Sequence, residues 1–476
     1  MKRPRIVRVL FVLLGCLILV VAVALIYDGS VLLGSGTRTA TSSGDCSELQ
    51  ERHRSMREHE YTQIKLPFSP RYQNHCGRTW QLQYLALHRK IVSEQRDDPT
   101  QQRLAVYDAY RNGLGDRLTM SVTVFLYALL TDRAFRIKWS GAPLETAVDS
   151  PFGVQWLYEP TDDDPSLGKV EMRDYLQEGI GYEWRAINKA FGDNDLRRLV
   201  PERTRTTVLR LNQGQIWELF ANPHHRQQLF ELGLRPETAF GCVLNFLMHP
   251  NREAAALVRP QYDALLATPP GSLRIGLQVR FGDTVFFDRK VCGEAELQSN
   301  WSAQFERCAA ELEEAYQLEA RIHPVPPGQN ALFFRGPPFP VNDTKSVYLL
   351  VSDCEPFRRA LQRRFVAGKL ITQLENSIKH IDFVDRDSPV GITRSEIQGL
   401  RLAVAEFFLF GLTDLHVITR DSSFGRAAAF RSLRPHAIYS IPSIDYVRGT
   451  FIPRGGICNR HNWDQWREAV MHWIRL

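Results

Sequence analysis

The chain has 476 residues, a hydrophobic fraction of 44%, a charged fraction of 24% and a formal net charge of +6. This composition excludes a largely disordered chain, and the length predicts two subdomains rather than a single core. The positive charge is spread thinly, without the dense basic stripe of nucleic-acid-binding proteins. Nucleic acid is therefore excluded as a partner, whereas a local basic pocket for a nucleotide is allowed.

The N-terminus carries the pattern of a membrane anchor. Val9 to Tyr27 is a run of 19 residues without a charge, and such a helix would span roughly 28 Å, close to the thickness of a bilayer core. Basic residues precede the run and an acidic residue follows it: Lys2, Arg3, Arg5, Arg8 and Asp28. The positive-inside rule predicts a cytosolic tail (1–8) and a lumenal bulk. A cleaved signal peptide has a shorter apolar core, so we predict an uncleaved signal anchor of a single-pass type II protein.

Residues 28–70 follow as a stem, in which 29–46 is rich in Gly, Ser and Thr. We expect globular subdomains over 71–270 and 271–476. The eight cysteines include one in the anchor, and the other seven form no CxxC pair that would indicate a zinc site. In a lumenal domain some of them should form disulfide bonds. Seven is odd, so at least one is free or pairs between chains, as in a homodimer.

The first α/β pattern begins with a short strand over 104–107. It leads through Asn112-Gly113-Leu114-Gly115-Asp116-Arg117 into an apolar helix over 118–131. Strand, glycine turn and buried helix is the layout of a nucleotide-binding crossover, in which the helix N-terminus favours anions. Tight turns also use glycine, so a purely structural interpretation remains open.

A second strand is predicted over Ser272–Arg280, where Ile275, Leu277 and Val279 share one face. Arg280 stands at its carboxyl end, before Phe281-Gly282-Asp283. Open α/β sheets bind ligands at this position, and a guanidinium suits a diphosphate. The alternative is an Arg280–Asp283 ion pair that only stiffens the turn.

Further elements follow in chain order. Residues 323–342 are Pro-rich and predict a loop, Asn300 and Asn342 begin glycosylation sequons, and 346–352 and 415–419 predict strands. A helix is expected over 392–412, with Thr393 and Glu396 spaced as a capping box. The final turn, Ser422-Ser423-Phe424-Gly425, precedes a helix of small residues. The start of this helix either binds an anion or is simply capped by Ser423.

In combination, four stretches resemble the plant-type (xyloglucan-like) α-1,2-fucosyltransferases, of which this chain looks like a distant member. They are the opening loop and helix over 112–137, a middle block over 208–257, the segment RIGLQVRFGD over 274–283 and the last block over 396–429. The resemblance covers most of the chain from Asn112 to about Cys458.

The resemblance implies a GT-B-like α/β fold with two facing Rossmann-like subdomains, the first on the acceptor side and the second binding the GDP-sugar. It implies GDP-fucose as donor, a glycan or polysaccharide acceptor, inversion, no metal or other cofactor, a Golgi location and a role in cell wall biogenesis. The positions that match the family's donor motifs are Gly113, Gly115, Arg117, Gln278, Arg280, Ser422, Ser423 and Phe424.

The chain departs from the family where Asp116 replaces an asparagine and where Ser423 replaces a threonine. Arg280 is expected to stabilise the leaving diphosphate, and Asp116 and Asp283 are the candidate bases. Two other functions stay open. A metal-dependent transferase would use a D-x-D motif at Asp162-Asp163-Asp164 or Asp385-Arg386-Asp387, which we interpret as exposed acidic loops. A glycan-binding protein of the same fold would have lost turnover. His224-His225 is interpreted as a surface turn.

Overall fold

The structure, a computed structural model, describes residues 72, 75–77, 79–94, 98–109, 112–175, 184–211, 214–269, 272–282, 301–322, 346–375, 392–420, 422–434 and 437–441. The predicted tail, anchor and stem lie outside these ranges. Among the described residues, no helix is both long enough and apolar enough to cross a membrane. Both sheets described below belong to one compact unit, Phe68–Leu476.

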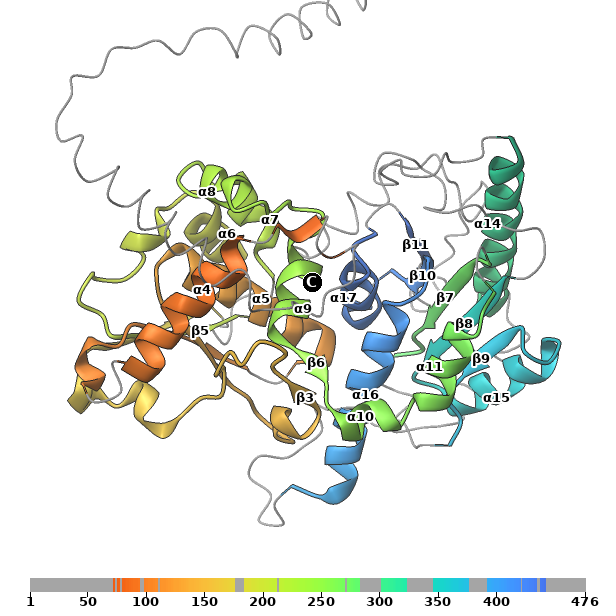
Figure 1. Cartoon of the computed structure of the whole chain (residues 1–476), viewed down its shortest axis with the longest axis horizontal. Helices are drawn as coiled ribbons and strands as arrows, with labels where there is room; N and C mark the ends of the chain where they lie inside the picture. Colours follow the sequence, from red (N-terminus) through yellow and green to blue (C-terminus); the bar gives the residue numbers. More distant parts are fainter. Residues whose placement is uncertain are drawn as a thin grey trace, which may run out of the picture. The chain divides into compact units, whose positions relative to one another are not determined.

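A parallel four-stranded sheet organises the N-terminal half, in the order β2-β1-β5-β4. This half is drawn in orange to yellow-green in Figure 1. Its strands are β1 (Leu104–Asp108), β2 (Ala134–Lys138), β4 (Val170–Asp174) and β5 (Thr206–Arg210). The predicted strand at 104–107 is confirmed. Helix α5 (Leu114–Leu130) connects β1 to β2 and begins four residues earlier than predicted, because Gly113 is its extended N-cap and Gly115 lies inside its first turn.

A parallel five-stranded sheet organises the C-terminal half, in the order β11-β10-β7-β8-β9. Its strands are β7 (Arg274–Val279), β8 (Val347–Ser352), β9 (Leu370–Thr372), β10 (Leu415–Thr419) and β11 (Ile438–Ile441). The predicted strands are confirmed. The fold is therefore of the α/β class with parallel sheets, and the predicted fold class is confirmed to that extent.

Helices complete each half. Helix α16 (Arg394–Phe410) begins at the predicted capping box of Thr393 and Glu396, and α17 (Ser423–Arg431) follows β10. The remaining α-helices are α4 (Thr79–Arg89), α6 (Trp184–Gly192), α7 (Ile216–Ala221), α8 (Arg226–Glu231), α9 (Ala239–Leu247), α10 (Arg252–Ala256), α11 (Arg259–Leu266), α14 (Ser302–Ile322) and α15 (Glu355–Arg364). The short elements are β3 (Val148–Asp149), β6 (His249–Pro250), the π-turn Lys90–Glu94 and 3-10 turns at 99–101, 144–146, 160–163, 165–167 and 196–198.

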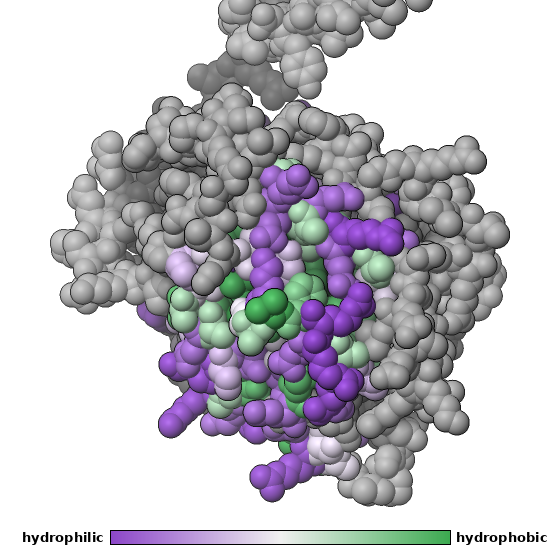
Figure 2. Space-filling view, turned by 90° about the vertical axis from the view of Figure 1, so that its right-hand side faces the viewer, coloured by the Kyte–Doolittle hydropathy of each residue, from purple (hydrophilic) through white to green (hydrophobic). Residues whose placement is uncertain are grey.

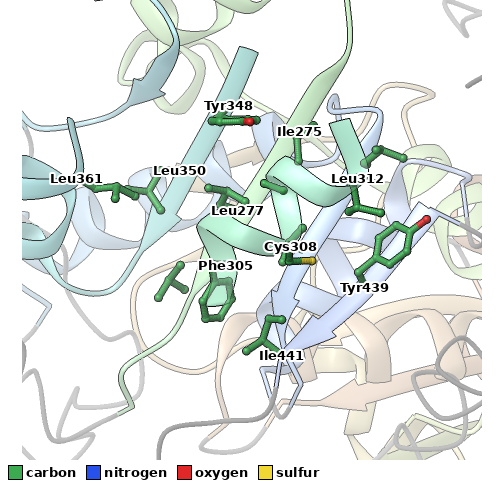
Figure 3. Close-up of a cluster of buried hydrophobic side chains, with 14 of the residues drawn as sticks. Ile275, Leu277, Phe305, Cys308, Leu312, Tyr348, Leu350, Leu361, Tyr439 and Ile441 are labelled. Carbon is green, nitrogen blue, oxygen red and sulfur yellow. The ribbon is translucent and has the colours of Figure 1, made fainter. Parts of the chain in front are cut away.

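The core of the C-terminal half lies between its sheet and helices α14 and α15. Buried side chains from β7, β8, β10 and β11 meet Phe305, Cys308 and Leu312 of α14 and Leu361 of α15 (Figure 3). This packing holds the strands in place, and it therefore fixes the position of the residues that follow their carboxyl ends. Among the residues coloured in Figure 2, one face of this half is mainly hydrophilic, with small scattered hydrophobic areas.

Disulfide bonds are present, as predicted. Cys76 bonds to Cys242 and ties the segment before α4 to α9, across a sequence separation of 166 residues. Cys308 and Cys354, both buried in the C-terminal core, are also disulfide-bonded. Such bonds form and persist in oxidising compartments.

Removal of the long-range disulfide should destabilise the protein strongly. Replacing both Cys76 and Cys242 with serine is expected to lower the free energy of unfolding by about 3–5 kcal/mol, because the unfolded chain regains the entropy of a long loop. Denaturant titration under non-reducing conditions measures this, with Cys16→Ser, outside the globular unit, as control. An unchanged midpoint would show that α4 and α9 hold together without the bond.

Candidate functional site

The first turns of α5 and α17 meet at Gly115. A Cβ atom at this position would lie 2.5 Å from the carbonyl oxygen of Ser423, and closer still to the amide nitrogen of Phe424. Only glycine therefore allows the two backbones to approach so closely. The neighbouring Asp116 accepts a hydrogen bond from the Ser423 hydroxyl at 2.9 Å, across a sequence separation of 307 residues. The predicted opening loop and final turn thus form one site.

Arg117 braces the opening loop from inside. It is only 2% exposed, and its Nε donates to the carbonyl oxygen of Asn112 and its Nη1 to that of Ser140, each at 2.7 Å. Its guanidinium also lies over the ring of Trp139, 4.9 Å from the centroid. These contacts give Arg117 a structural role. Gly113 is the N-cap of α5. Contact of Arg117 or Gly113 with the donor substrate stays a prediction.

Arg280 stands where β7 ends, beside the end of β10. Its backbone N–H donates to Thr419 Oγ1 at 2.9 Å, and the Thr419 hydroxyl donates to the carbonyl oxygen of Gln278 at 3.2 Å. The Gln278 side chain accepts from the Thr419 N–H at 3.3 Å and leaves no space for a Cβ at Gly425. The predicted residues Gln278 and Arg280 therefore lie next to the start of α17.

Asp353 holds the turn that follows Arg280. Its carboxylate accepts from the N–H groups of Phe281 at 2.9 Å and Gly282 at 3.2 Å. Burial raises the pKa of Asp353, although the positive charge of Arg280 and these two N–H groups oppose the rise. Asp283, the predicted ion-pair partner and candidate base, lies outside the described residues. The sequence signal for Asp353 was its place directly after the parallel neighbour strand β8.

The start of α17 is capped by Ser422 rather than Ser423. The Ser422 side chain accepts from the Gly425 N–H at 3.1 Å, whereas the Ser423 hydroxyl turns to Asp116. The Phe424 ring packs edge-on against Phe407 of α16, with centroids 5.5 Å apart. All three predicted residues of the final turn therefore lie at the junction with α5.

Arg420, which directly follows β10, was not among the predicted site residues. Its Nε is buried and has no hydrogen-bond partner within the part of the chain that the structure describes. Arg280 and Arg420 follow neighbouring strands, β7 and β10, and α17 begins three residues after Arg420. Two cationic side chains and a helix N-terminus thus gather at one edge of the C-terminal sheet, and all three favour an anion.

Other predicted positions have different surroundings. Asn300, Asn342 and Asp385-Arg386-Asp387 lie outside the described residues, although Trp301 and Ser302 of the first sequon are buried. The interpretation of 162–164 as an exposed acidic loop is wrong for Asp162, which is 2% exposed.

Each carboxylate of this acidic segment has a local role. Asp162 accepts from the Glu159 N–H at 2.8 Å, Asp163 binds Lys138 at 3.1 Å, and Asp164 accepts from the Ser166 N–H at 2.8 Å. The three groups therefore stabilise the turns in which they lie.

The surface turn predicted at His224-His225 is confirmed for His224, which is exposed in a turn, and is wrong for His225. His225 is fully buried, and its Nε2 accepts from the Leu196 N–H at 2.8 Å. Burial lowers the pKa of His225. It is a core residue, because Asn222 and the 3-10 turn at 196–198 fold over it.

Known relatives confirm the predicted resemblance. No protein-family model matches the chain. It is similar to putative fucosyltransferase 10 of Arabidopsis thaliana, at 25% identity over 358 residues, covering 69% of this chain and 63% of that protein. It is also similar to galactoside 2-alpha-L-fucosyltransferase of Pisum sativum, at 26% identity over 195 residues, covering 36% of this chain and 34% of that protein.

Among solved structures, an arginine-to-lysine variant of Arabidopsis thaliana FUT1 in complex with GDP superimposes with a TM-score of 0.49 and 17% identity, covering 84% of each chain. The sequence matches identify this chain as a distant relative of plant fucosyltransferases. The chain spans less than two thirds of the length of putative fucosyltransferase 10 and of the Pisum sativum enzyme.

Proposed function

We propose that this chain is a fucosyltransferase that transfers fucose from GDP-fucose to a hydroxyl group of a galactoside. The observation that carries the proposal is the junction at Gly115, Ser423 and Arg280, where the motifs that resemble the fucosyltransferase family lie side by side. The similarity to enzymes named fucosyltransferases supports it. The fold proposed with this function is GT-B-like, with the donor held by the C-terminal half.

The chemistry of transfer needs stabilisation of the leaving group. The bond between the fucose anomeric carbon and the diphosphate oxygen breaks, and its electron pair leaves on GDP. The acceptor oxygen bonds to that carbon from the opposite face, which inverts its configuration, and loses its proton. Arg280 and the N-terminus of α17 would offset the charge that develops on the diphosphate.

Asp116 is better suited to positioning than to proton abstraction. One of its carboxylate oxygens already accepts the Ser423 hydroxyl at 2.9 Å, which fixes the first turn of α17 against α5. In the proposed mechanism the acceptor proton leaves through Asp283 or through water. The linkage is proposed to be α-1,2 on galactose.

The proposed enzyme needs no metal ion, because the positive charge for the diphosphate comes from Arg280 and the helix N-terminus. We expect the full-length protein to hydrolyse or transfer from GDP-fucose at the same rate with and without EDTA. Initial rates measured with GDP-fucose, GDP-mannose and UDP-galactose provide the check. A preference for UDP-galactose contradicts the proposed function.

Two outcomes of the same assay favour the other functions. Loss of activity in EDTA, restored by Mn²⁺, favours a metal-dependent transferase. GDP binding without turnover on any glycan favours a non-catalytic glycan-binding protein.

We further propose that the enzyme acts in the Golgi lumen, held by the segment 9–27 as a type II signal anchor. The charge asymmetry around that segment and the disulfide bonds of the globular unit support this location. Protection of the globular unit from added protease in sealed Golgi vesicles would agree with it. Digestion of that unit in intact vesicles would contradict it.

A further inference from the structure

Helix α17 belongs to the C-terminal half by its connections but packs against the N-terminal half. It follows β10 and precedes β11, two strands of the C-terminal sheet. Its start contacts α5 at Gly115, and its end contacts α9, which lies beside it in Figure 1. The position of α17 therefore depends on both halves of the molecule.

Gly241 brings α9 against the end of α17. A Cβ atom at this position would lie 2.7 Å from the carbonyl oxygen of Phe430, 2.7 Å from Cδ2 of Leu433 and 3.2 Å from the carbonyl oxygen of Arg431. These distances leave no room for a side chain, so glycine lets the backbone of α9 lie directly on the last turn of α17. Helix α17 is thus held by a close glycine contact at each end, Gly115 and Gly241.

Asn245 of α9 and Arg431 of α17 exchange hydrogen bonds across this contact. Arg431 Nη1 donates to Asn245 Oδ1 at 2.9 Å, and Asn245 Nδ2 donates to the carbonyl oxygen of Arg431 at 3.4 Å. Arg431 Nη2 donates to the carbonyl oxygen of Phe408 in α16, and the guanidinium lies 4.6 Å from the centroid of the Phe408 ring. Gly411 makes the space for it, because a Cβ there would lie 2.7 Å from Arg431 Nε. One side chain thus joins α9, α16 and α17.

Helix α9 is firmly anchored in the N-terminal half. Its Cys242 is disulfide-bonded to Cys76, and its Phe246 packs edge-on against Trp80, with ring centroids 5.0 Å apart. Asn245 directly precedes Phe246 and is 8% exposed. The core of the N-terminal half therefore holds the amide of Asn245 in place.

The opposite end of α17 forms part of the proposed donor site. Ser422 caps this end, and Ser423 donates to Asp116. Helix α17 has 9 residues, so Ser423 and Arg431 lie about 12 Å apart along its axis. A helix this short shifts as one body, so movement of its last turn displaces its first turn. Hydrogen bonds are directional, so the Asn245–Arg431 pair defines the position of α17 more narrowly than apolar packing would.

We propose that Asn245 and Arg431 are positioning residues for fucose transfer, which hold the N-terminus of α17 where the diphosphate of the donor binds. This inference rests on the proposed function. It makes donor binding depend on α9 of the N-terminal half, although Arg280 and Arg420 follow strands of the C-terminal sheet. Asn245 and Arg431 act through α17, without contact with a substrate.

The test compares Asn245→Leu, Arg431→Met and the double variant in the full-length protein, by steady-state kinetics, GDP binding and thermal unfolding. Each single variant should raise the KM for GDP-fucose and the Kd for GDP about tenfold, the equivalent of one lost hydrogen bond to a charged group. The KM for a galactose-terminated acceptor should stay unchanged. Each single variant should also lower the thermal midpoint, because the remaining partner is left unpaired.

The double variant separates positioning from stability. With both polar side chains gone, no partner is left unpaired, so the thermal midpoint should recover toward that of the wild type. The KM for GDP-fucose should stay raised about tenfold, because two apolar side chains do not replace the directional bonds that fix α17.

Asn245→Asp and Arg401→Met are the controls. Asn245→Asp keeps an oxygen acceptor for Arg431 Nη1, so the KM for GDP-fucose should equal that of the wild type. Arg401 of α16 also bonds across the two halves, since its Nε donates to the carbonyl oxygen of Thr146 at 2.7 Å, but it lies outside α17. Arg401→Met should therefore leave the KM for GDP-fucose unchanged.

Several outcomes overturn the inference. If the double variant recovers both the thermal midpoint and the KM for GDP-fucose, the pair is only structural. A wild-type KM for GDP-fucose in both single variants, or an equal rise in either control, has the same consequence. A wild-type protein that neither binds GDP nor consumes GDP-fucose contradicts the proposed function instead.

Discussion

Replacing Arg280 with alanine is expected to reduce kcat/KM for GDP-fucose by about 10²–10³-fold, the usual effect of removing one donor that stabilises a developing anion. Arg280 follows the central strand β7 and lies one strand from β10, whose end leads into α17. Its loss removes a guanidinium from the edge where the leaving diphosphate is proposed to lie. Arg280→Lys should lose less, because lysine keeps the charge but not the bidentate fork.

The fold should survive this change. The backbone N–H of Arg280 keeps its bond to Thr419, and Asp353 keeps its bonds to the N–H groups of Phe281 and Gly282. Steady-state rates with and without acceptor measure the loss, and thermal unfolding monitors the fold.

The control for this prediction is Arg359→Ala. Arg359 is an exposed helical residue that pairs with Glu355 one turn away at 2.8 Å. It should retain the wild-type rate, and a full rate in Arg280→Ala would contradict the donor assignment.

The elements that sequence predicted best are those with a strong local signal. Strand β7 has apolar residues at alternate positions, β10 is mainly apolar, and α16 begins at a side-chain capping box, so short segments of sequence determine them. Helix α14 was not predicted, because its apolar positions are interrupted by acidic residues and its burial depends on strands formed far away in sequence.

The site was predicted residue by residue but not as an arrangement. Gly115 and Ser423 were predicted in two separate loops. Their contact depends on packing between segments that are far apart in the sequence, as the separation of 307 residues between Asp116 and Ser423 shows. Asp353 and Arg420 were missed for the same reason. Each looks ordinary at the end of its own strand, and its place in the site depends on the neighbouring strand β7.

The junction itself can be tested with Gly115→Ala, for which we expect a fall of about 1–3 kcal/mol in the free energy of unfolding and a loss of fucose transfer. The added methyl would overlap the backbone of Ser423 and Phe424, so α17 must move away from α5. Alanine is favoured over glycine inside a helix by about 1 kcal/mol. Helix propensity alone would make Gly115→Ala stabilising. A destabilised variant would therefore report the close contact between α5 and α17.

Gly113→Ala is the matched control two residues earlier. A Cβ there would meet only Asp116 Oδ2 at 3.6 Å, an ordinary contact, and the N-cap backbone at φ −62° accepts alanine. Its free energy of unfolding should change by less than about 1 kcal/mol. Denaturant titration and transfer rates of the two variants give the comparison. If Gly115→Ala matched Gly113→Ala in both measurements, α5 and α17 would not need their close approach, and Ser423 would not depend on Asp116 for its position.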